Sequence, residues 1–145
     1  MARLMFSNES VLVHFYNVDF AVGPGCPNKR DDVLLVQYLM KAVFDSAPTE
    51  RPPGPPLTVD GVAGEITFRH ITRVQDLAHR LGKTTQAVDG RVDKAKKTTV
   101  ASISHTVYTI VNLCAGYKHA RPKDYANIAL AADCPKELAA LFSLE

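Results

Sequence analysis

The first 22 residues differ from the rest of the chain in how apolar and polar positions alternate. From Val11 to Val22, apolar or aromatic side chains occupy both alternating sets of positions, and β-branched and aromatic residues dominate. This pattern favours an extended strand that must be covered on both faces. We predict that the segment pairs with Arg3–Phe6 across a turn at residues 7–10. Glycine and proline residues within 23–27 then end the strand.

Two segments in the first half of the chain have apolar residues at the spacing of a helix. Asp31 or Asp32 is expected to cap a helix that ends near Phe44. A second helix is predicted to begin near Glu65 and to end before Gly82, a glycine in the C′ position. Its apolar stripe comprises Thr67, Ile71, Val74, Ala78 and Leu81, and its polar face comprises Arg69, Arg73, Asp76 and Arg80.

Three more helices are predicted in the C-terminal part. The segment from Thr98 to Leu113 has apolar residues at helical spacing, although its threonine, valine and isoleucine content favours a strand locally. Gly116 is expected to stop this helix. Pro135 is expected to open a last short helix at residues 136–142. Between them, Pro122 opens a helix whose apolar face would carry Tyr125, Ile128, Ala129 and Ala132.

These elements are expected to form one domain, because 145 residues is the common size of a single domain. Five of the nine prolines lie in residues 46–56, which excludes a helix there and indicates an extended connector within the domain. The chain then divides into a β-prone segment (1–22), a core (22–98) and C-terminal helices (99–145). The predicted fold class is mainly α, a small helical bundle with an N-terminal β segment.

Composition constrains the function only weakly. Hydrophobic residues make up 46% and charged residues 22% of the chain, which is typical of a globular protein. No apolar run reaches the ~18 residues that a membrane span needs. The net charge of +2 does not by itself indicate nucleic acid. Residues 69–97 hold eight basic and three acidic residues, so attraction to an anionic polymer is a minority alternative.

The cysteines and the first residues of the chain indicate the cellular compartment in which the protein is made. Cys26, Cys114 and Cys134 form an odd, widely spaced set, which favours reduced thiols, with a Cys114–Cys134 bridge as the lesser alternative. The first residues lack the long apolar stretch of a secretory signal, so the protein is expected in the cytoplasm at synthesis.

Catalytic signatures are weak. Gly82 and the residues after it lack the first glycine of a phosphate-binding loop. The histidines show no metal-ligand spacing, and His70 and His79 are expected at the surface. Asp60 and Asp89 each precede a glycine, which favours a turn over the paired acids of a glycosidase. A thiol nucleophile at Cys26 is less favoured than a turn residue. We therefore predict no enzymatic activity, no cofactor and no bound metal.

Four short sequence motifs, here called phrases, occur in the same order as in a known protein family. They are Val22-Gly23-Pro24-Gly25-Cys26-Pro27-Asn28, Asp32-Val33 with Val36-Gln37, Val59-Asp60-Gly61, and Val88-Asp89-Gly90. Over residues 22–98 the chain resembles the peptidoglycan-binding-like domain family, small helical modules found in bacterial and phage cell-wall enzymes. It departs from the family pattern at Cys26 (usually glycine), His70 (alanine), Val74 (aromatic) and Lys94 (proline).

The resemblance implies a non-catalytic binding module. Its ligand would be cell-wall glycan or stem peptide, held in a shallow groove between helices. The predicted ligand contacts are Asn28, Gln37, Asp60 and Gln75.

An alternative function is a structural or self-assembling component of a phage particle or of a contractile or secretion apparatus, built on the same scaffold. A strand at residues 11–22 with two apolar faces would recruit a second copy and give a homo-oligomer. The competing possibility is that residues 117–145 fold back over it. A wall-binding protein in such a system would leave the cell by lysis or injection.

Overall fold

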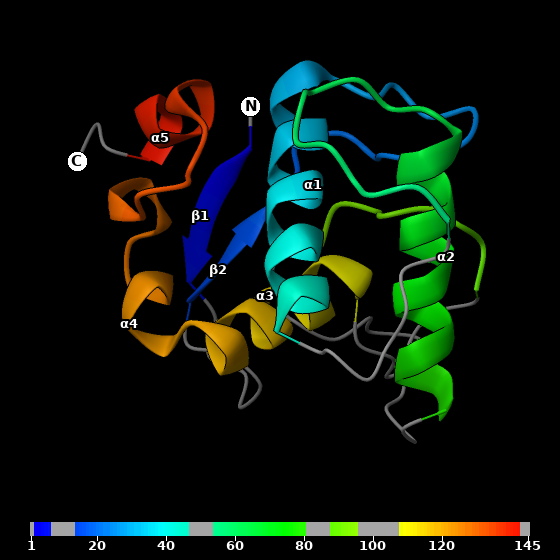
Figure 1. Cartoon of the computed structure of the whole chain (residues 1–145). Helices are drawn as coiled ribbons and strands as arrows, with labels where there is room; N and C mark the ends of the chain where they lie inside the picture. Colours follow the sequence, from blue (N-terminus) through cyan, green and yellow to red (C-terminus); the bar gives the residue numbers. More distant parts are fainter. Residues whose placement is uncertain (1, 7–13, 47–53, 81–87, 96–107, 143–145) are drawn as a thin grey trace.

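The computed structural model describes residues 2–6, 14–46, 54–80, 88–95 and 108–142, and it is mainly helical with a small N-terminal sheet. The helix α1 (Arg30–Asp45) lies in the middle of the molecule, with α2 (Glu65–Arg80) on one side and the sheet and C-terminal helices on the other (Figure 1). The predicted fold class, mainly α with an N-terminal β segment, is confirmed at this level.

The sheet consists of β1 (Arg3–Phe6) and β2 (His14–Asn17), which pair antiparallel with Arg3 opposite Asn17 and Phe6 opposite His14. The predicted pairing is therefore confirmed. The strand is shorter than predicted, because the chain bends after Asn17. The Asp32 carboxylate accepts hydrogen bonds from the backbone amides of Asp19 and Phe20 at 2.8 and 3.0 Å, which fixes this bend.

Both faces of β2 are covered by the same chain. Phe15, Tyr16, Asn17 and Val18 are almost completely buried. The helix α3 (Thr109–Ala120) packs on β2, and α5 (Lys136–Phe142) packs on β1. Residues 15–18 therefore need no second copy to bury them, and the predicted homo-oligomer through residues 11–22 stays a prediction. Residues 11–13 lie outside the described part of the chain.

The helices α1 and α3 form the central helix pair. Gly116 lies within α3, so the prediction that it stops the helix is wrong. A Cβ atom at Gly116 would lie 2.8 Å from a methyl carbon of Val43, so the glycine allows close approach of the two helices. The predicted helix start at Thr98 lies outside the described residues.

The helix α2 follows its predicted pattern. Thr67, Ile71, Val74 and Ala78 are buried, whereas Arg69 is exposed. The prediction that His70 is a surface residue is wrong: its ring packs edge-on against Phe44 and its Nδ1 lies 2.7 Å from the Ile66 carbonyl oxygen. Leu81 and Gly82 lie outside the described residues.

Two predicted helix boundaries also change. Asp31 and Asp32 do not cap α1 but lie in its first turn. There a carboxylate interacts favourably with the positive N-terminal end of the helix dipole. The single helix predicted after Pro122 is instead α4 (Pro122–Tyr125) followed by the 3₁₀ helix η1 (Ile128–Leu130). The break occurs because the Asn127 side chain accepts a hydrogen bond from the Ala129 amide and caps η1. The last helix, α5, matches its prediction.

All three cysteines are free thiols, so the Cys114–Cys134 bridge is not formed. In the described part of the chain, no helix is long and apolar enough to cross a membrane.

Candidate functional site

The side chain of Gln37 organises the turn after the proline-rich connector. Its Oε1 accepts hydrogen bonds from the amides of Asp60 and Gly61 at 3.0 and 2.9 Å. Its Nε2 donates to Asp60 Oδ1, to the Val62 carbonyl oxygen and to Thr67 Oγ1 at 3.0 to 3.2 Å. We call this arrangement the first clamp. It ties α1, the turn at residues 60–62 and α2 together.

Gln75 forms a second clamp with the same chemistry. Its Oε1 accepts from the Gly90 amide at 2.9 Å, and its Nε2 donates to Asp89 Oδ1, the Arg91 carbonyl oxygen and Thr109 Oγ1. The glycines of the two turns have similar positive φ angles, 77° at Gly61 and 74° at Gly90. The two Asp-Gly phrases are therefore one structural unit used twice.

The identity of the second threonine was missed by sequence reasoning. Thr109, the first residue of α3, takes the place in the second clamp that Thr67 takes in the first. The sequence between the Asp-Gly turn and the clamp threonine is longer in the second clamp than in the first. Only the contact itself identifies Thr109, since the spacing in the first half does not carry over.

Asn28 holds a different loop. Its side chain accepts a hydrogen bond from the Gly23 amide at 2.8 Å and donates to the carbonyl oxygens of Gly23 and Cys26. The loop lies against the second turn through paired backbone hydrogen bonds between Val22 and Val92, at 3.0 and 2.7 Å. Asn28 therefore positions this loop beside Gly90.

The four predicted ligand contacts are thus not gathered in one place. Gln37 and Asp60 meet in the first clamp, Gln75 lies in the second clamp, and Asn28 closes the loop. Gln37 and Gln75 are each only 1% exposed, and both of their amide ends already bind protein groups. Asp60 is the exposed member of the set. A direct ligand contact by either glutamine would require breaking a clamp.

A groove opens beside each turn. The first-turn groove, with a cavity volume of about 400 Å³, is lined by residues that include Gln37, Leu57, Asp60, Val62, Glu65 and Ile66. The second-turn groove, of about 500 Å³, is lined by residues that include Pro24, Phe68, Arg69, Thr72, Asp76 and Val88. Both volumes lie within the range of small-ligand sites.

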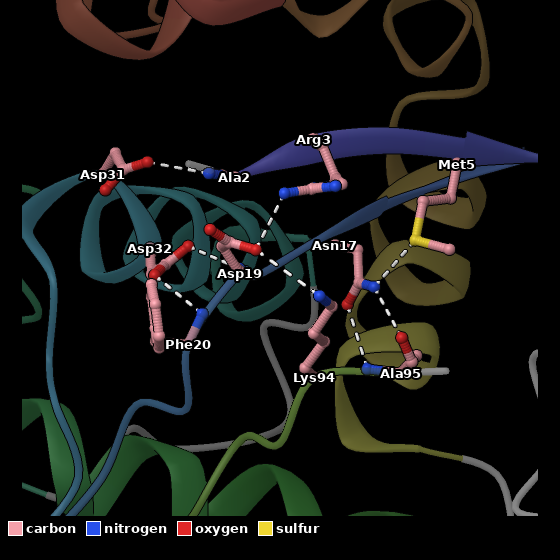
Figure 2. Close-up of polar contacts among 10 residues, drawn as sticks. All are labelled: Ala2, Arg3, Met5, Asn17, Asp19, Phe20, Asp31, Asp32, Lys94 and Ala95. Carbon is pink, nitrogen blue, oxygen red and sulfur yellow. Dashed lines mark hydrogen bonds and ion pairs between the residues drawn. The ribbon is translucent and has the colours of Figure 1, made fainter. Parts of the chain in front are cut away.

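A third polar cluster fastens the N-terminal strand to α1 (Figure 2). Asp31 Oδ2 accepts from the Ala2 amide at 2.7 Å, and the Asp19 carboxylate pairs with Arg3 and Lys94. Burial raises the pKa of the Asp32 carboxyl, and the hydrogen bonds from Asp19 and Phe20 partly offset that rise. This cluster is satisfied internally and serves as a structural anchor.

A fourth cluster holds the C-terminal segment on α1. The Tyr38 hydroxyl donates to Asp133 Oδ1 at 2.7 Å, and Arg121 pairs with the same carboxylate at 2.8 Å. Glu137 of α5 forms two hydrogen bonds with the Arg30 guanidinium, at 2.7 and 2.8 Å. These contacts place the segment 133–137 along the face of α1 that carries Arg30 and Tyr38.

The candidate metal ligands, thiol and acids of the sequence can be located in the described part of the chain. Within these ranges, no group of three histidine, cysteine, aspartate or glutamate residues could hold a metal ion. Cys26 is half-buried, with its thiol 3.7 Å from the Pro24 carbonyl oxygen. Asp60 and Asp89 each accept from the amide two residues ahead, at 2.9 Å, as turn residues do.

Comparison with known proteins gave no match to a family model, to a curated protein or to a solved structure.

Proposed function

We propose that this chain is a non-catalytic binding module whose ligand is a cell-wall glycan or stem peptide. The observation that carries the proposal is the duplicated clamp. The phrases that resemble peptidoglycan-binding-like domains include the Asp-Gly turn of both clamps and Gln37 of the first clamp, and Gln75 lies within the same resembling range, residues 22–98. The resemblance therefore falls on residues that shape the scaffold.

The first-turn groove is the proposed ligand site. Val62 is 63% and Ile66 39% exposed, so two apolar side chains face solvent beside polar groups. Glycans and stem peptides offer the matching chemistry, because they combine sugar C–H faces or alanine methyl groups with many amides and hydroxyls. Asp60 and Glu65 would accept hydrogen bonds from these donors. Gln37 would act indirectly, by holding the turn that carries Asp60 and Val62.

The turn acids favour binding over catalysis. Asp60 and Asp89 have their carboxylates engaged by the clamp amide and by the turn backbone. A glycosidase needs one carboxyl group that donates a proton and a second that attacks or activates water. Carboxylates that serve as fixed acceptors do not supply that pair.

Cosedimentation with purified peptidoglycan sacculi tests the proposal. The double variant Val62→Ser/Ile66→Ser should lose most of the binding, because it removes the exposed apolar surface of the groove. Leu130→Ser is the matched control, since Leu130 is 80% exposed on η1, outside this groove, and it should bind as wild type. Far-UV circular dichroism should show that both variants fold.

Two results would contradict the proposed ligand, and a third would contradict the non-catalytic part. One is wild-type protein that stays in the supernatant at all sacculus concentrations. The other is binding that disappears when teichoic acid is stripped from the sacculi, which would assign the ligand to an anionic polymer instead. Clearing of the sacculus suspension, abolished by Asp60→Asn, would contradict the non-catalytic part.

A further inference from the structure

The turn of the first clamp is also held from its solvent side, by Arg30 at the start of α1. The Nη1 atom of Arg30 donates a hydrogen bond to the Asp60 carbonyl oxygen at 2.9 Å. A Cβ atom at Gly61 would lie 2.9 Å from both Cγ and Nη1 of Arg30, so the arginine side chain lies directly against the turn. A glycine at this position makes the close approach possible.

The same guanidinium group binds the C-terminal helix. Its Nε and Nη2 atoms donate to the two carboxylate oxygens of Glu137 at 2.8 and 2.7 Å, the bidentate geometry of a strong arginine–carboxylate pair. Glu137 is the second residue of α5, and its neighbour Leu138 is completely buried in the core. One side chain of α1 therefore joins a docked helix to a turn that is distant from it in sequence.

The second clamp indicates that the turn conformation does not require this arginine. Seven positions before the clamp glutamine, α1 has Arg30 whereas α2 has Phe68. The atoms within 4 Å of a Cβ atom placed at Gly90 belong to Thr72 and Pro24. The glycine φ angles of the two turns nevertheless agree, at 77° and 74°. The clamp thus specifies the turn conformation, and what Arg30 adds is the connection to α5.

The turn that Arg30 holds forms part of the first-turn groove. Asp60 and Val62 both line this groove, and Val62 is 63% exposed. A binding surface that is already ordered before the ligand arrives loses less conformational freedom on binding. A contact that restrains the backbone of this turn therefore increases the affinity of the groove.

We propose that Arg30 is a positioning residue that couples the docked helix α5 to the first-turn groove, so that the packing of α5 regulates ligand affinity. This regulation rests on the proposed function, because it acts on the same groove. The Glu137 carboxylate fixes the plane of the guanidinium group, and the guanidinium group fixes the Asp60 carbonyl group. The planar fork of arginine serves both acceptors at once, which the point charge of a lysine does not.

The exposure of the ion pair sets the size of the effect. The side chains of Arg30 and Glu137 are 55% and 57% exposed, so water screens their attraction. An exposed pair of this kind changes an equilibrium by at most about fivefold. The affinity of the groove should therefore change by about two- to fivefold when the pair is lost, which is a graded regulation.

The variant Glu137→Gln, made in the full chain, tests the coupling. It removes the ion pair and leaves Leu138 in the core. The amide NMR signals of residues 60–62 should shift, and the Kd for purified sacculi should rise by about two- to fivefold. Asp45→Asn is the matched control, since it makes the same charge change and also breaks an exposed ion pair, with Lys41 at 3.3 Å. It should leave both readings unchanged.

A double variant tests whether the effect passes through Arg30. Arg30→Gln should itself weaken sacculus binding, and adding Glu137→Gln should then have no further effect, because the link is already broken. Arg30→Lys should not restore the wild-type affinity, because lysine does not reproduce the planar fork. Independent, additive effects of the two substitutions on the affinity would overturn the proposal.

Two more results would overturn it. One is unchanged signals of residues 60–62 in Glu137→Gln, since the turn would then not respond to α5. The other is shifted signals with an unchanged sacculus affinity, since the turn would then not regulate the groove. The signals are recorded on the free protein. If the wild-type protein does not bind sacculi, the proposed function fails, while the coupling of α5 to the turn is still decided by these signals.

Discussion

The first clamp predicts a large loss of stability on replacing Gln37 with leucine. Gln37→Leu keeps a buried side chain of similar size but removes the acceptor for the Asp60 and Gly61 amides. The Gly61 hydrogen bond is fully buried and that of Asp60 is partly buried. Each unsatisfied buried amide costs about 1–3 kcal/mol. Burial of the leucine returns about 1.5 kcal/mol.

Taking about 2 kcal/mol for each of the two amides, the net loss in the free energy of unfolding should be about 2.5 kcal/mol, a large share of the ~5–15 kcal/mol that a domain has. The melting temperature should fall by roughly 5–10 °C. Urea unfolding followed by circular dichroism measures the loss. Lys41→Leu is the matched control, because Lys41 is exposed on the same helix and forms a surface ion pair with Asp45 at 3.3 Å. It should cost about 0.5 kcal/mol or less.

Gln75→Leu provides an internal check on the same reasoning. If the two clamps are equivalent, its cost should match that of Gln37→Leu within about 1 kcal/mol. The reasoning is refuted if Gln37→Leu unfolds at the same urea concentration as Lys41→Leu, since the clamp would then contribute nothing measurable.

Three further predictions concern other parts of the molecule. Gly116→Ala should destabilise the protein by about 1–2 kcal/mol through the contact with Val43, and in a Val43→Ala background the same change should become neutral or stabilising in a thermal melt. Burial raises the pKa of Asp133, but the hydrogen bonds from Tyr38 and Arg121 outweigh it and hold the pKa below the ordinary 3.8. The stability that this carboxylate contributes is therefore present above pH 3.8 and lost as the pH falls below it, so Asp133→Asn should flatten the acid limb of a stability–pH curve; an unchanged acid limb would disprove the assignment. Burial raises the pKa of Cys114 to about 12, so at pH 8 a thiol reagent should modify Cys26 in the native protein and Cys114 only after urea is added.

Local sequence patterns determined several elements correctly. The 3.6-residue spacing of α2 predicted both its buried stripe and its start at Glu65. Proline at the first position predicted α5, and β-branched and aromatic residues beyond a turn at residues 7–10 predicted the pairing of β1 with β2. These features depend on residues that are close in sequence, and the side chains of neighbours suffice to specify them.

Contacts between distant residues were decided only by the tertiary structure. The pattern at Gly116 is that of a helix stop, but the approach of α3 to Val43 makes a glycine necessary inside the helix. The sequence predicts His70 at the surface, but the packing of Phe44 against its ring buries it. The predicted length of β2 failed because Asp32, in the next helix, binds the backbone at Asp19 and Phe20.

The candidate site shows the same division. Local sequence was enough to predict the two Asp-Gly turns, and it singled out Gln37 and Gln75 as candidate ligand contacts. It did not determine that each glutamine faces its own turn, or that Gln75 reaches Thr109, which is 34 positions away. Side-chain hydrogen bonds over such separations depend on how whole helices pack.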